Sequence, residues 1–299
     1  MRPGVMLPLH DIGGDPDMLR DFVEKTEAQG FTNLGLADHV LGVNVATRPD
    51  WGDRNTSADL FHDPFVCFAF VAGFARKTTE FSTQVLILAQ RQAVLVAKQA
   101  ASLDVLCNGR FRLGVGVGWN PVEFTGLNEN FSNRGRRSAK QVVVMQKLWA
   151  EDHVTFDGRW HKIEDAGINP RPKSGKVEVW FGGHVPQTLD RIATIGDGWI
   201  MNAYAPGDDA LAEFAKLRAL TKQAGRPENA VGIEVWTSAG AGTPADWKAE
   251  AKFWKDAGAT HLTLTNTFNR RHHRRIAGKT PAAHLAAQQA WIDAVGSVL

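Results

Sequence analysis

Residues 81–121 read FSTQVLILAQRQAVLVAKQAASLDVLCNGRFRLGVGVGWNP. The stretch begins with an apolar run at 81–88, continues with a segment of helical period at 93–106, and ends with a second apolar run at 112–117. Short apolar runs are typical of strands covered on both faces, and a helix between two such strands is the unit of a parallel sheet. The stretch therefore predicts a strand, a helix and a second, parallel strand.

The same alternation extends over the whole chain. We expect eight strands, each followed by a helix, at about residues 5–9, 33–37, 81–88, 112–117, 177–181, 198–201, 231–236 and 261–265. Eight such units in 299 residues fit a closed (β/α)8 barrel, the TIM barrel, better than an open doubly wound sheet. The open alternative requires a G-x-G-x-x-G turn after the first strand, and residues 8–14, PLHDIGG, do not provide it.

Three segments are longer than a strand–helix unit requires. Loops at about 40–62 and 120–135 follow the second and fourth strands, and residues 154–161, VTFDGRWH, form an expected hairpin before the fifth strand. Loops of this length are usually lids or binding loops. No linker rich in Pro, Gly or Ser divides the chain, so we expect one domain over residues 1–299.

Composition limits the class of protein. The 34 Lys and Arg residues against 32 Asp and Glu residues leave a formal net charge of +2, which gives no reason to expect a nucleic acid or a membrane as partner. Cys67 and Cys107 lack His or Cys partners at metal-ligand spacing, so we expect no metal site. No apolar run approaches the ~18 residues of a membrane span, and no signal-peptide region follows Met1. These features predict a cytoplasmic enzyme for a small-molecule substrate.

In such a barrel the chemistry lies at the carboxyl ends of the strands. The candidate residues there are Asp38, His39, Gln84, Val85, Trp119, Asn120, Gly182, Gly183, His184 and Tyr204. The Gly182-Gly183 pair precedes a helix and offers bare backbone amides for a phosphate, although such a pair also occurs in simple tight turns. His39 is a candidate proton donor, with a loop histidine beside a capping Asp38 as the alternative.

One charged run needs a separate interpretation. Residues 270–275, RRHHRR, form a dense basic patch near the end of the chain. A solvated loop is the favoured interpretation, and a site for an anionic ligand tail is the alternative.

Seven motifs together resemble the bacterial luciferase-like superfamily, in its F420-dependent oxidoreductase branch. They run in order along about residues 5–205: DH at 38–39, QVLIL at 84–88, AKQAASLD at 97–104, NGRFRLGVGVGWNPVEF at 108–124, RGRR at 134–137, VWFGG at 179–183 and GDGW at 196–199. The motif at 108–124 is the most specific of them. The resemblance implies a TIM barrel that binds a flavin or the deazaflavin coenzyme F420 in its mouth.

The resemblance favours F420 over flavin mononucleotide (FMN). Several luciferases that use FMN carry an Arg for its phosphate where this chain has Val117. The implied activity is hydride transfer between C5 of F420 and a small organic substrate. An FMN-dependent monooxygenase and a non-catalytic flavin-binding barrel are the alternatives, and a homodimer that uses the Trp-bearing helices is expected.

The resemblance also implies roles for individual residues. Asp38, His39, Trp119 and Asn120 would lie near the ring of the coenzyme, Gln84 and Val85 would form a non-prolyl cis peptide behind it, and Gly182, Gly183 and His184 would bind the phosphate. His39 is the first candidate proton donor and Tyr204 the second, with a surface position as the alternative for Tyr204. Trp51, Trp119, Phe124 and Tyr204 would contact the substrate. Sugar-phosphate dehydrogenases of the family carry a catalytic Glu at the position of Trp119, so that activity is not expected here.

Overall fold

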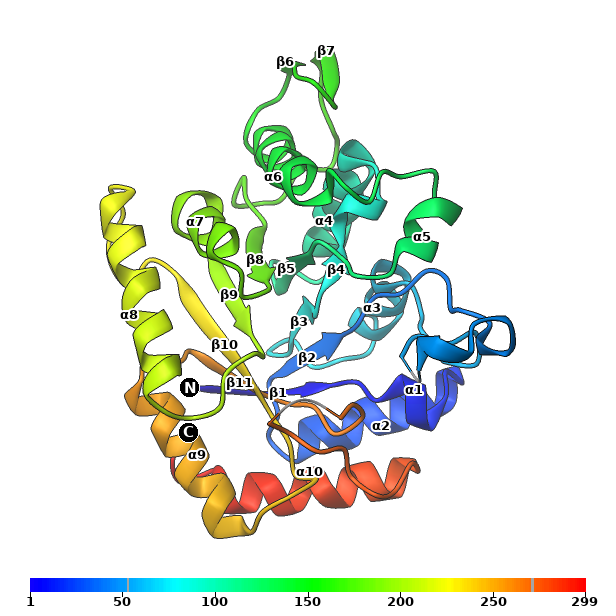
Figure 1. Cartoon of the computed structure of the whole chain (residues 1–299), viewed down its shortest axis with the longest axis vertical. Coiled ribbons are helices and arrows are strands. Elements are labelled where there is room, and N and C mark those ends of the chain that lie inside the picture. The colour runs from blue at the N-terminus through cyan, green and yellow to red at the C-terminus, as the bar shows by residue number, and fades with distance from the viewer. Residues whose placement is uncertain (53, 270–271) are drawn as a thin grey trace.

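Eight parallel strands form the barrel that the sequence predicts. The computed structural model describes residues 1–52, 54–269 and 272–299. The strands are β1 (Arg2–Met6), β2 (Asn33–Leu36), β3 (Glu80–Thr83), β5 (Phe111–Gly116), β8 (Glu178–Gly182), β9 (Gly198–Met201), β10 (Gly232–Thr237) and β11 (His261–Leu264). They are hydrogen-bonded in the order β3-β2-β1-β11-β10-β9-β8-β5, and β3 also pairs with β5. This last pairing closes the sheet into a TIM barrel (Figure 1).

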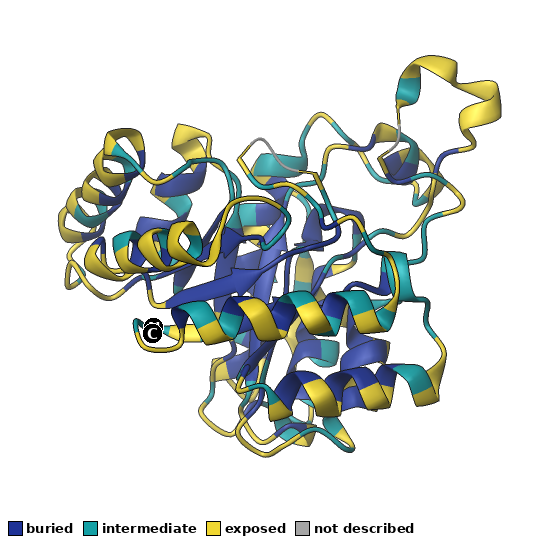
Figure 2. Cartoon of the chain, turned by 90° about the horizontal axis from the view of Figure 1, so that it is seen from below, coloured by how far each residue is buried: buried dark blue, intermediate teal, exposed yellow. Residues whose placement is uncertain are grey.

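Helices surround the barrel, and their outer faces are exposed (Figure 2). They are α2 (Pro16–Ala28), α3 (Pro64–Ala72), α4 (Ala93–Leu106), α6 (Arg134–Ala150), α7 (Pro186–Ile195), α8 (Asp208–Gln223), α9 (Pro244–Asp256) and α10 (Pro281–Val295). Proline occupies the first helical position of five of them, where its fixed φ and missing N–H cost nothing. Asp15, Asp63, Thr243 and Thr280 cap four of these five with side-chain oxygens. No described helix is long and apolar enough to cross a membrane.

The three expected insertions are present. Residues 37–63 follow β2 and include the short helices η1 (Val45–Thr47) and η2 (Pro49–Trp51), and α5 (Pro121–Gly126) follows β5. The hairpin before β8 pairs β6 (Val154–Asp157) with β7 (Lys162–Ala166) in antiparallel fashion and projects from the barrel (Figure 1). Its second strand lies beyond the predicted 154–161, because residues 158–161 are used for the turn. A further short helix, α1 (Leu9–Ile12), follows β1.

The strand predicted at 81–88 is interrupted. It consists of β3 and of β4 (Leu86–Ile87), which pairs with β5, and the short helix η3 (Leu88–Gln90) follows. The bond between Gln84 and Val85, in the interruption, is cis, so the predicted non-prolyl cis peptide is confirmed. A Cβ on Gly116 would lie 2.4 Å from Val85, and one on Gly182 would lie 3.0 Å from it. Two neighbouring strands therefore carry glycine where the Val85 side chain needs space.

Candidate functional site

Four aromatic rings meet beyond the ends of β2 and β5. We call them the mouth cluster: His39, Trp51, Phe61 and Trp119. The His39 ring lies 4.9 Å from Phe61 and 5.9 Å from Trp119, and Trp51 lies 5.7 Å from Trp119. Trp119 is 39% exposed. The structure therefore brings together three residues that the sequence selected, and adds Phe61.

The carboxylate of Glu123 holds one nitrogen of His39. Both Glu123 oxygens lie 3.2 Å from His39 Nδ1, and the carboxylate also accepts hydrogen bonds from the Val40 amide (2.7 Å) and from Gln90 Nε2 (3.3 Å). Burial raises the pKa of Glu123, but the hydrogen bond and charge of His39, together with these other donors, outweigh burial and lower the pKa below its usual value. An ionised Glu123 therefore occupies Nδ1 of His39, and Nε2 is the nitrogen left for chemistry.

Sequence reasoning missed Glu123. It is an acidic residue in the first turn of α5, where a carboxylate is ordinarily explained by the helix dipole. Its partner His39 lies 84 positions away. The sequence predicts residues 120–135 as a loop, so neither the helix α5 nor its approach to the end of β2 was anticipated.

Asp38 is buried and paired within the protein. It is 2% exposed, and its carboxylate accepts a hydrogen bond from the Ile87 amide (2.9 Å) and pairs with Arg91 (2.8 Å). Burial raises the pKa of Asp38, and the charge of Arg91 opposes this shift. Asp38 therefore ties the end of β2 to the segment after β4, and its place near a coenzyme ring stays a prediction.

Two predicted contacts are corrected by burial. Phe124 is 1% exposed and packs with Ile87 and Ala89, so it lies beneath the mouth and gives no surface to a substrate. Asn120 is fully buried, and its side-chain oxygen accepts a hydrogen bond from the Val122 amide at the start of α5 (2.9 Å). Its role is to cap α5, since a carboxamide in that place satisfies a free helix amide.

The turn after β8 keeps the form expected of a phosphate site. Gly183 has a φ of +110°, which glycine adopts without strain, and Trp199 Nε1 donates a hydrogen bond to its carbonyl (2.7 Å). His184 is exposed, and α7 begins at Pro186 without a side-chain cap. The amides at this end of α7 therefore face an open turn at the positive end of the helix dipole.

Tyr204 lies across the barrel from His39. It follows β9, which is four strands from β2 in either direction around the barrel. Partial burial raises the pKa of Tyr204, and the nearby Glu213 and Asp209 raise it further, so the phenol stays protonated at neutral pH. Its role as second proton donor stays a prediction.

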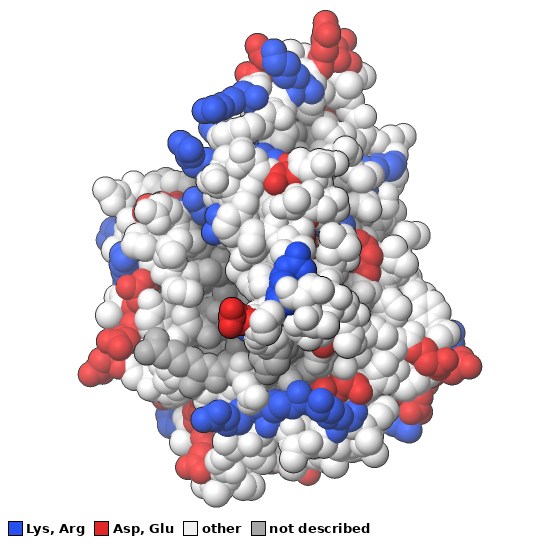
Figure 3. All heavy atoms as spheres, turned by 45° about the vertical axis from the view of Figure 1, so that its right-hand side comes forward, with Lys and Arg blue, Asp and Glu red and all other residues white. Residues whose placement is uncertain are grey.

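Three side chains of the basic run contact the rest of the protein. His273 contacts Glu250 (2.9 Å), Arg275 pairs with Asp11 (2.8 Å), and His272 contacts the Ala203 carbonyl (3.0 Å). Residues 270 and 271 lie outside the described residues. On the face shown in Figure 3, basic and acidic side chains are interspersed. An anionic tail would have to displace Asp11 to reach Arg275.

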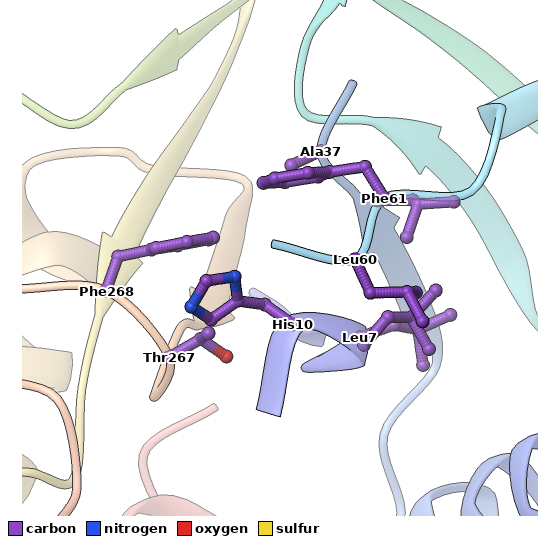
Figure 4. Close-up of a pocket in the computed structure, with 9 residues that line it drawn as sticks. Leu7, His10, Ala37, Leu60, Phe61, Thr267 and Phe268 are labelled. Carbon is purple, nitrogen blue, oxygen red and sulfur yellow. The ribbon is translucent and has the colours of Figure 1, made fainter. Parts of the chain in front are cut away.

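Two cavities among the described residues bear on the site, and none of the predicted site residues lines either of them. One, of about 10 Å³, has room for roughly a single water molecule. It lies at the mouth, where His10, Phe61 and Phe268 approach one another (Figure 4). The other, about 830 Å³, lies outside the barrel between α4, α6 and the hairpin. Among the described residues, no group of three or more His, Cys, Asp or Glu side chains is placed to hold a metal ion.

Comparison with known proteins identifies the family. A model described as luciferase-like monooxygenase matches residues 1–295. The chain belongs to the luciferase-like family. Membership of this family supports the assignment of the chain as an oxidoreductase.

Individual relatives agree with this assignment. An uncharacterized protein of Mycobacterium tuberculosis is 31% identical over 205 residues, which are 67% of this chain and 70% of the relative. The FMNH2-dependent dimethylsulfone monooxygenase of Pseudomonas fluorescens is 31% identical over 184 residues, which are 53% of this chain and 50% of that protein. The structure of an F420-dependent secondary alcohol dehydrogenase with an F420–acetone adduct has a TM-score of 0.75 at 18% identity, covering 100% of this chain and 99% of the other. The monooxygenase and the dehydrogenase use different coenzymes according to their names, so the likeness alone does not choose between F420 and FMN.

Proposed function

We propose that this luciferase-like chain is an F420-dependent oxidoreductase that transfers a hydride between the coenzyme and a small organic substrate in the barrel mouth. The observation that carries the choice of coenzyme is Val117, an apolar residue directly after β5 where several FMN-dependent luciferases have a phosphate-binding Arg. An FMN-dependent monooxygenase is the second candidate, supported by the relative from Pseudomonas fluorescens.

The residues at the mouth fit a flat ring with a phosphate-bearing tail. Ala37 and Val85 are half-buried and lie on an apolar cluster in the barrel interior, so they offer a floor for a ring. Gly182 and Gly183 leave the turn before α7 free of side chains, as close approach of a phosphate requires. A non-catalytic barrel would not need His39 held by an ionised carboxylate.

The chain's own groups then have three tasks. When bound, F420 supplies the hydride at C5 of its ring. His39, oriented through Nδ1 by Glu123, donates or accepts the substrate proton at Nε2. Trp119 lies edge-on to this histidine, and Trp51 packs against Trp119, so both rings offer an apolar wall to a substrate beside His39. The amides near Gly183 hold the phosphate of the coenzyme.

The proposal includes a homodimer. Of the Trp side chains on these helices, Trp149, Trp254 and Trp291 are fully buried and Trp247 on α9 is partly exposed, so only Trp247 can contribute to that contact. Exposed apolar side chains lie instead on α3 and α4, where Val66 is 69% and Leu106 is 70% exposed. This surface supports association of two copies, and the mass of the protein in solution tests it.

Coenzyme titrations test the proposed function. We expect F420 to bind with at least about tenfold higher affinity than FMN, since Val117, directly after β5, supplies no guanidinium to pair with the FMN phosphate. Tight binding of FMN without a response to F420, followed by fluorescence, would overturn the choice of coenzyme. Binding of neither would support a non-catalytic barrel.

A glycine variant tests the phosphate turn. Gly183→Val should weaken coenzyme binding by about tenfold, because a side chain at this positive φ distorts the turn. Gly109→Val is the matched control: Gly109 has a φ of +78° and open space around it, and lies at the other end of the barrel, before β5. Equal affinities in the two variants would remove the turn from the coenzyme site.

A further inference from the structure

The side chain of Gln84 is held from across the barrel. Its Nε2 donates to Ser82 Oγ (2.8 Å) and to the carboxylate of Glu234, and its Oε1 accepts a hydrogen bond from Trp236 Nε1 (2.6 Å). Both donors of the carboxamide are therefore used, and its oxygen has a partner. All of these groups are buried, so the orientation of Gln84 is fixed by the protein alone.

Glu234 gives this arrangement a charged anchor. It is fully buried on β10, and Arg112 of β5 pairs with it at 2.8 Å. Thr263 of β11 and Asn33 of β2 also donate to it. Four strands around the barrel thus converge on the carboxylate that holds Gln84.

Val85, on the other side of the cis bond, links the fixed orientation of Gln84 to the floor of the mouth. Its side chain occupies the space left by Gly116 and Gly182 and packs on the interior cluster of Met6, Trp180, Ile200 and Trp236. Trp236 therefore acts on this peptide in two ways. Its N–H fixes Gln84, and its ring belongs to the surface on which Val85 rests.

We propose that Trp236 is a positioning residue for the bound coenzyme: through Gln84 it sets where Val85 stands at the floor of the mouth. The inference rests on the proposed function, since it assigns Val85 to the surface that the ring contacts. Neither Trp236 nor Glu234 lies among the residues that the sequence selected, because both precede the carboxyl end of β10.

The test compares two tryptophan variants. Trp236→Phe removes the N–H and keeps an aromatic ring. Trp149→Phe is the matched control, because Trp149 is also fully buried and donates to a protein carbonyl (2.9 Å), but lies on α6 outside the barrel. We expect Trp236→Phe to raise the dissociation constant of F420 about tenfold. It should also shift the absorption spectrum of bound F420, while the control stays within about twofold. Equal affinity and spectrum in the two variants would overturn the inference.

A measurement without coenzyme separates this inference from the proposed function. Methyl signals of Val85, identified by their loss in Val85→Ala, report its position in the free protein by NMR. We expect them to broaden or double in Trp236→Phe and to stay single in Trp149→Phe. If the unchanged protein binds neither F420 nor FMN, the proposed function fails. Single, sharp Val85 signals in Trp236→Phe would refute the positioning role, whether or not a coenzyme binds.

Discussion

Glu123 and Glu234 are two buried carboxylates whose environments give them different tasks. Both have pKa values below their usual range, because hydrogen bonds and positive charge outweigh the effect of burial. Glu123 faces a histidine that opens to the mouth, whereas Glu234 faces Arg112, which remains charged at any pH that the fold survives. A carboxylate paired with a titratable ring can assist proton transfer, while one paired with a permanent cation holds strands in place.

Removing the permanent cation should have the largest effect. Arg112→Met leaves Glu234 ionised and buried without its partner, which we expect to lower the free energy of unfolding by about 3–5 kcal/mol. Urea denaturation measures it. The double variant Arg112→Met/Glu234→Met should recover much of the loss, and a single variant as stable as the unchanged protein would show that the pair is not the anchor.

Removing the titratable partner at the mouth should affect turnover far more than stability. His39→Ala should lower kcat by about 100-fold or more, the usual contribution of a general acid or base. Affinity for the coenzyme should stay within about tenfold, since His39 is assigned to the proton and not to the phosphate. Steady-state kinetics with reduced F420 measure this, and unchanged turnover would exclude His39 from the mechanism.

The interior also contains a histidine that stays neutral. Burial, with the charge of Arg112, lowers the pKa of His261 to about 3. The unfolded chain binds this proton near pH 6.5 and the folded chain does not, so stability is complete above pH 6.5 and falls as the pH decreases toward 3. Between pH 7 and pH 5 the unchanged protein should lose about 2 kcal/mol more than His261→Gln.

An exposed histidine provides the control for this pH dependence. His184→Gln should keep the slope of the unchanged protein, because His184 is exposed on the turn after β8. Urea denaturation of the three proteins at both pH values measures the slopes. Parallel slopes for His261→Gln and the unchanged protein would contradict the assignment.

Neutralising the carboxylate at the mouth should give the smallest change in stability. Glu123→Gln keeps an acceptor for the Val40 amide but loses the charge beside His39, so we expect a loss of about 1 kcal/mol at pH 7. The lowered pKa of Glu123 means that its contribution is present above pH 4.5 and disappears as the pH falls through the folded-state value. The two proteins should therefore converge in stability at low pH, and the pH profile of kcat should shift in the variant.

The sequence predicted the barrel because strand and helix periods are local properties. Each of the eight strands was readable from its own apolar run, and the cis bond at Gln84 followed from a motif. The contacts between side chains were harder to predict from the sequence than the strands. Asn120 directly follows the exposed Trp119 and Phe124 lies five positions after it, but both are buried at α5. The contact of His39 with Glu123 and that of Gln84 with Trp236 join residues 84 and 152 positions apart, so only the closed barrel brings them together.

Arg91 holds both ends of the insertion after β2 together. One guanidinium binds Asp38, at the start of that insertion, and Asp63, the residue that caps α3 at its end. Both ends of this insertion, which has more than twenty residues, are thereby bound to the same side chain. The base of the insertion, and with it the end of β2 and the start of α3, is therefore held independently of the segment that carries Trp51.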